Sequence, residues 1–143
     1  MAEDSQNGWG LAANGCSGNA EIHVDSRFIS ESDSDSELWQ LEIHLPNFYL
    51  RFAIQGPGLV SDLITFLQCH MDQEEFHETQ LGNLGDCTVS LLKCDECAGH
   101  FIFLVSSNTG AVRFDIFSKE ARDFVAALED ANADLVRSGE DLP

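Results

Sequence analysis

The chain has 143 residues, with 25 Asp plus Glu against seven Lys plus Arg and a formal net charge of −18. That length suits one domain with its own hydrophobic core. The charge excludes simple nucleic-acid binding, because phosphate contacts require clustered Lys and Arg, and it disfavours an anionic membrane surface as a partner. No apolar run approaches the roughly 18 residues of a spanning helix, and no secretory signal is visible. We therefore expect a cytoplasmic protein that binds neither nucleic acid nor membrane.

The first half of the chain predicts strands. Residues 1–19 are rich in Gly, Asn, Ser and Ala and predict a flexible tail. A strand follows over 21–29, and the acid-serine run 30–37 predicts a solvated loop. Strict alternation of apolar and polar residues predicts half-buried strands over 38–45 and 48–55.

The second half of the chain predicts both helices and strands. A helical period runs over 59–71, and strands are predicted over 76–81, 87–91, 101–105 and 112–116. Ser118 is the expected N-cap of a last helix that Ser138-Gly139 stops. We expect an α+β fold, with one twisted antiparallel sheet of about six to seven strands and two helices packed on one face. The single domain covers 20–137, and 138–143 form a C-terminal tail.

The five cysteines are an odd number, which favours a reducing compartment over a disulfide framework. Cys94-Asp95-Glu96-Cys97-Ala98-Gly99-His100 has the look of a zinc knuckle, in which two thiolates three residues apart reach one ion. The alternative zinc set would be Cys87, Cys94, Cys97 and His100, although a second Cys-x-x-Cys pair is missing. The favoured interpretation is a hairpin turn between two strands, with no metal and no cofactor.

The run 30–37 leaves several alternatives open. Asp33, Asp35 and Glu37 are hard oxygen ligands at alternate positions, as in a calcium site, but the Gly and closing Glu of an EF-hand loop are absent. The run could also be a phosphorylation target, a solvated loop, or part of a face for a basic protein.

No catalytic signature is complete. Cys69 and His70 are neighbours, but adjacent helical residues point in different directions, and no nucleophile elbow or phosphate-binding glycine loop is present. We therefore expect no enzyme. His23 and His44 lie on polar strand faces and could meet across a hairpin as a metal or pH-sensing pair, although separate surface histidines are the favoured interpretation.

The arrangement from Leu38 to Leu135 resembles small bacterial immunity proteins that neutralise polymorphic or contact-dependent toxins. The resemblance rests on the paired strands 38–45 and 48–55 with the helix 59–71, on the stretches 85–91 and 99–105, and on the ending 112–117 that leads into 124–128. Membership would imply a cytoplasmic protein with no enzymatic activity and one cognate toxin.

The leading hypothesis is therefore an immunity-type inhibitor that binds and occludes a basic toxin, possibly a nuclease, through an acidic surface. Acids complement the Lys and Arg of a nuclease cleft and speed encounter. The candidate contacts are loop acids: Glu31, Asp33, Asp35, Glu37, Asp72, Glu74, Glu75, Asp95 and Glu96. The alternatives are a DNA-mimicking protein inhibitor and a small zinc-binding module.

Overall fold

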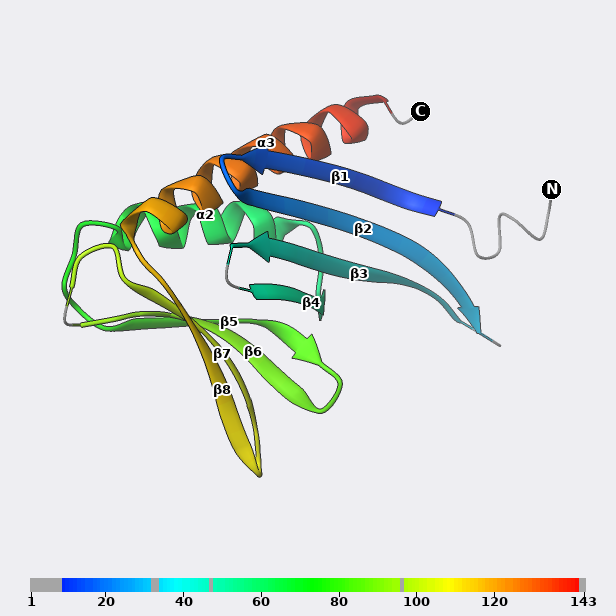
Figure 1. Ribbon diagram of the computed structural model, residues 1–143. Coiled ribbons are helices and arrows are strands. Elements are labelled where there is room, and N and C mark those ends of the chain that lie inside the picture. Colours follow the sequence, from blue (N-terminus) through cyan, green and yellow to red (C-terminus); the bar gives the residue numbers. More distant parts are fainter. Residues whose placement is uncertain (1–8, 32–33, 47, 96, 142–143) are drawn as a thin grey trace.

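The computed structural model describes residues 9–31, 34–46, 48–95 and 97–141. Within this part of the chain, eight strands form one open antiparallel sheet in chain order, and two helices follow β4 and β8 (Figure 1). The elements are β1 (Trp9–Ser17), β2 (Ala20–Glu31), β3 (Ser34–Leu45), β4 (Phe48–Ile54), α2 (Gly58–His70), β5 (His77–Leu84), β6 (Cys87–Lys93), β7 (Phe101–Ser107), β8 (Gly110–Ile116) and α3 (Ser118–Asp141). The α+β prediction is confirmed, whereas the predicted six to seven strands are too few.

The additional strand is β1, which lies in the segment that the sequence predicted as a tail. It pairs with β2 from Trp9 to Ser17, and the prediction of a tail is wrong for these residues. An added Cβ on Gly15 would lie 1.9 Å from the Ala127 carbonyl oxygen of α3. The close approach of helix and strand requires small residues here, and small residues give a weak strand signal in the sequence.

The acid-serine run is also part of the sheet. Pairing of β2 with β3 continues without a break from Glu21↔His44 to Glu31↔Ser34, so residues 30–31 and 34–37 belong to the ends of two strands and not to a loop. Backbone hydrogen bonding carries the hairpin beyond its last apolar residues. Residues 32–33 lie outside the described residues.

Both helices lie on the same side of the sheet (Figure 1). The apolar face predicted for β3 is buried against them: Trp39, Leu41, Ile43 and Leu45 are at most 8% exposed. The predicted stripe of α3 is buried as well, and its Phe124 ring contacts the Phe103 ring of β7 at 5.5 Å. The core prediction is therefore confirmed on both layers.

The ends of α3 differ from the prediction. The backbone N–H of Phe117 donates to the Glu120 carboxylate at 2.9 Å, and the Phe117 carbonyl accepts from Ala121 at 2.8 Å. Phe117, and not Ser118, therefore holds the N-cap position. The helix continues past Ser138 and Gly139 to Asp141, so the predicted C-terminal tail begins too early.

The sheet is nearly divided between β4 and β5, which share one pair of Cα partners, Ala53↔Asn83. At this crossing an added Cβ on Gly82 would lie 2.0 Å from the Ala53 carbonyl oxygen, so only glycine fits. Each half therefore consists of four strands followed by one helix. An open groove of about 680 Å³ lies at the division, with the polar side chains of Gln55, Asp62, Gln80 and Asn83 in its lining.

Candidate functional site

Four neighbouring strands begin or end in one row across the second half of the sheet. His77 pairs with Lys93, Lys93 with Phe101, and Phe101 with Ile116. This register brings three connections to the same end of the molecule: the α2–β5 loop (71–76), the β6–β7 loop (94–100) and the junction of β8 with α3. They lie together on the left of Figure 1.

This end carries exposed acids and two exposed aromatic rings. Its acids come from both loops, and its rings, Phe76 and Phe117, are each 54% exposed. We call this surface the acidic end; its members are Asp72, Glu74, Glu75, Phe76, Asp95 and Phe117. Aromatic side chains are enriched at protein–protein interfaces, and complementary charge accelerates the encounter of the two partners.

The remaining predicted contacts lie elsewhere. Glu31, Asp35 and Glu37 are at the far tip of the β2–β3 hairpin, about ten residues or roughly 33 Å beyond the Glu21↔His44 pair. Figure 1 places this tip on the opposite side from the acidic end. Asp33 and Glu96 lie outside the described residues. The nine predicted contact residues therefore do not form one surface.

The Cys94–His100 segment is the predicted hairpin turn. The Cys94 N–H donates to the His100 carbonyl at 2.9 Å, and Gly99 adopts a φ of +78°. The ammonium group of Lys93, which is fully buried, donates to the carbonyls of Cys94 and Cys97. The turn is held from inside by a lysine side chain.

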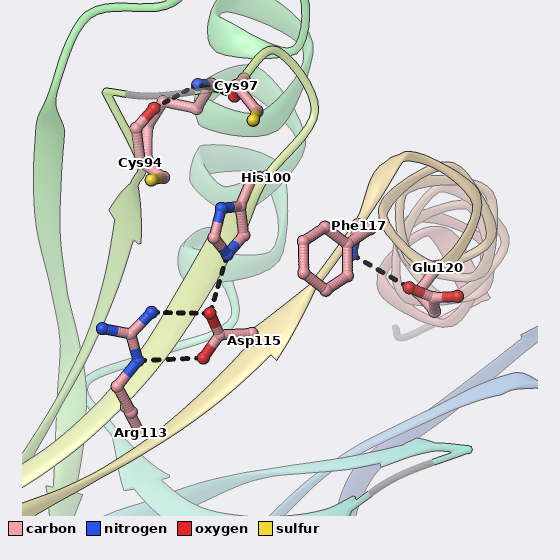
Figure 2. Close-up of polar contacts among 8 residues, drawn as sticks. Cys94, Cys97, His100, Arg113, Asp115, Phe117 and Glu120 are labelled. Atoms are coloured by element: carbon pink, nitrogen blue, oxygen red, sulfur yellow. Dashed lines mark hydrogen bonds and ion pairs between the residues drawn. The ribbon is translucent and has the colours of Figure 1, made fainter.

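The alternative zinc set is wrong in its geometry. Cys87 begins β6 and Cys94 follows its end, so the two lie about 23 Å apart along an extended strand. A tetrahedral zinc ion accepts ligands at about 2.3 Å and cannot join them. The His100 ring points away from the two turn cysteines towards Asp115, with Nε2 at 2.7 Å from the carboxylate (Figure 2).

Asp115 is the centre of an ion network at the base of the acidic end. Arg113 donates to it through Nε at 2.9 Å and Nη2 at 2.6 Å. These bonds are the largest cause that lowers the pKa of Asp115 to about 2, and the His100 hydrogen bond adds to them against the opposing effect of burial. The Phe117 ring stacks on His100 at 4.5 Å (Figure 2). The network therefore fixes the position of an exposed phenylalanine.

The other histidines form two pairs. His70 and His77 stack with ring centroids 3.8 Å apart, and the buried Nε2 of His77 has no hydrogen-bond partner among the described residues. His23 and His44 meet edge-to-face at 5.5 Å, as the hairpin alternative anticipated. Cys69 is exposed on α2, and the His70 ring makes its hydrogen bond with Gln73, whose Oε1 lies 3.1 Å from Nδ1.

Sequence reasoning missed two structural features, of which only the first leaves a signal in the sequence. Lys93 follows Val89 and Leu91 at alternate positions of β6, and all three side chains are buried. A lysine at an inward-facing strand position was the sequence signal for a buried amine. The second feature is that Asp134 and Asp130 of α3 accept from the backbone N–H groups of Asn14 and Cys16 at 3.1 and 3.2 Å. These carboxylates bind the outer edge of β1, and no local pattern indicates this.

Comparisons with known proteins give no assignment. The chain matches no family model, and searches of curated proteins and of solved structures found no match. In the described part of the chain, neither helix combines the length and apolar character that crossing a bilayer requires.

Proposed function

We propose that this protein is an immunity-type inhibitor that binds one basic partner protein, such as a toxin, with its acidic end. The observation that carries the proposal is the convergence of Asp72, Glu74, Glu75 and Asp95 from two loops beside the exposed rings of Phe76 and Phe117. The resemblance to bacterial immunity proteins supports the same function, and the overall charge of −18 favours a basic partner.

The acids and the rings have different tasks in this proposal. Solvent-exposed carboxylates attract Lys and Arg side chains over roughly 8 Å, the Debye length at physiological salt. This attraction accelerates the encounter with a basic partner. The phenylalanine rings bury apolar area after contact and slow dissociation. Phe117 suits this role because His100 and its ion network already hold the ring in place, which reduces the entropy lost on binding.

The experiment compares three immobilised proteins in lysate of the source cell: the natural chain, an acidic-end variant and a matched control. The variant carries Asp72→Asn, Glu74→Gln and Asp95→Asn. The control carries Asp62→Asn, Asp86→Asn and Glu129→Gln. It also loses three negative charges, but from exposed sites on α2, the β5–β6 turn and α3.

The proposal predicts one basic protein, retained in a 1:1 ratio by the natural chain and the control, lost from the variant and released by salt. The natural chain and the control then suppress the activity of that purified protein, and the acidic-end variant does not. Equal retention by all three proteins, or no stoichiometric partner, contradicts the proposal.

A further inference from the structure

A second cluster lies on the helix-free face of the sheet, where β2 begins and β3 ends, far from the tip of their hairpin. Its members form two cross-strand pairs, Glu21↔His44 and His23↔Glu42. Paired residues of an antiparallel sheet project from the same face about 5 Å apart. Their neighbours Leu41 and Ile43 are buried against the helices, so these four side chains point the other way. The cluster is separate from the acidic end.

Three of these residues bring metal-binding atoms together. One ligand atom each of His23, Glu42 and His44 lies within 4.8 Å of the other two. His44 Nε2 is 2.6 Å from the Glu42 carboxylate, and His23 Nε2 is 3.5 Å from the carboxylate of Glu21. Small movements of these side chains would bring two imidazole nitrogens and one carboxylate oxygen to about 2 Å from a common metal ion.

The surrounding side chains orient the two rings. Asn14 Oδ1 lies 2.5 Å from His23 Nδ1 and accepts a hydrogen bond from its N–H, so that Nε2, on the side of the cluster, is the ring nitrogen available to a metal ion. The Tyr49 ring contacts the His44 ring at 4.5 Å. The neighbouring cation, Arg51, donates both its Nε and Nη2 bonds to Gln40.

The Glu42 carboxylate is already held beside one of the two imidazoles. One of its oxygens lies 2.6 Å from His44 Nε2, and the Glu42 side chain is 27% exposed. A metal ion bound between the two groups would replace the proton that they share.

We propose that His23, Glu42 and His44 bind a divalent transition-metal ion of the Zn²⁺, Ni²⁺ or Cu²⁺ class, with Glu21 or water in the fourth position. Imidazole ligands select this class over Mg²⁺ and Ca²⁺, which prefer oxygen. The strongly negative protein raises the local concentration of cations. The ion would join β2 to β3 on the solvent face.

The test is equilibrium dialysis of the full chain against Zn²⁺, with Co²⁺ absorption and nuclear magnetic resonance as site readouts. We expect about one equivalent of Zn²⁺, no thiolate charge-transfer band with Co²⁺, and line broadening by Co²⁺ centred on residues 21–23 and 42–44. His44→Gln and Glu42→Gln each weaken binding at least about tenfold. Asn14→Ala, which keeps the backbone bond to Asp134, weakens it by a similar factor because it releases the His23 ring.

The control is His70→Gln, which removes an imidazole from the other histidine pair. It leaves Zn²⁺ affinity unchanged if the proposal is correct. Loss of binding in this variant, a thiolate band with Co²⁺, or no Zn²⁺ retained by the natural chain overturns the proposal.

Discussion

The side-chain ammonium group of Lys93 donates to the carbonyl oxygen of Cys97 at 2.8 Å, inside the turn whose cysteine spacing resembles a zinc knuckle. Its second bond goes to the Cys94 carbonyl, and its Nζ lies 5.9 Å from the centre of the Phe101 ring. The hydrogen bonds of Lys93 therefore stabilise the turn that carries Asp95 at the acidic end.

Replacement of Lys93 by methionine tests whether these hydrogen bonds stabilise the turn. Lys93→Met removes one donor from each of the two carbonyls and leaves that of Cys97 with only the long bond from the His100 N–H, at 3.4 Å. We expect the free energy of unfolding to fall by about 2–4 kcal/mol in urea denaturation. The matched control is Lys119→Met, since Lys119 is 75% exposed and its pair with Asp123 contributes less than about 1 kcal/mol. Equal effects of the two substitutions would show that the buried amine does not hold the turn.

Gly15 tests the contact of β1 with α3. In Gly15→Ala the new Cβ would lie 1.9 Å from the Ala127 oxygen and 2.6 Å from the Ala131 nitrogen, both of them backbone atoms. Helix and strand must separate, and we expect a loss of at least about 3 kcal/mol in thermal or urea unfolding. Gly110→Ala meets no atom within 4 Å and is the control. A Gly15→Ala protein as stable as this control would contradict the position of β1 beneath α3.

Asp130 tests the protection of the sheet edge. The first strand of a sheet presents unpaired N–H groups to solvent, and the carboxylate of Asp130 accepts the one from Cys16. Asp130→Ala should lower stability by about 0.5–1.5 kcal/mol and speed hydrogen exchange of the Cys16 amide, whereas Asp130→Asn retains an acceptor. Glu129→Ala, one residue away, leaves that amide unchanged. Unaltered exchange at Cys16 in Asp130→Ala would reject the edge contact.

These positions show how far the sequence predicts the fold. The alternation of Trp39, Leu41, Ile43 and Leu45 identified β3 and its buried face correctly, because a half-buried strand leaves a period of two. The same criterion failed at β1, where contact with a helix selects Ala13 and Gly15 in place of large apolar residues.

The candidate site was predicted less completely. Loop position alone selected Asp72, Glu74, Glu75 and Asp95 as candidates, and their role in binding stays a prediction. Their position at one end of the sheet depends on the register of β5, β6 and β7, which no local pattern encodes. The same limit explains the zinc set: the Cys-x-x-Cys spacing is local, whereas the position of Cys87 relative to the turn depends on the whole length of β6.

Asp115 predicts a pH dependence of stability. Its pKa in the folded protein is about 2, below the ordinary value of 3.8, so the folded state binds fewer protons than the unfolded state in this interval. The stabilisation is complete above about pH 5 and is lost progressively as the pH falls through 4 and 2 towards about 1. At neutral pH, Asp115→Asn should cost roughly 1–2 kcal/mol after allowance for solvent screening.

Urea denaturation of the natural chain and of Asp115→Asn between pH 2 and 7 measures this effect. The difference in stability between the two proteins should shrink as the pH falls from 4 to 2. A difference that stays constant over this range would show that the Arg113 and His100 bonds do not depend on the charge of Asp115.

The rate of association with the captured partner tests the central claim most directly. Stopped-flow measurements would follow the natural chain, the acidic-end variant (Asp72→Asn, Glu74→Gln, Asp95→Asn) and the control variant (Asp62→Asn, Asp86→Asn, Glu129→Gln) over a range of salt concentrations. We predict that the acidic-end variant associates about tenfold more slowly at low salt and with a flatter salt dependence, while the control stays within about twofold of the natural chain. Equal rates and equal salt slopes for the two variants would contradict a specific role for the acidic end and leave only the overall charge.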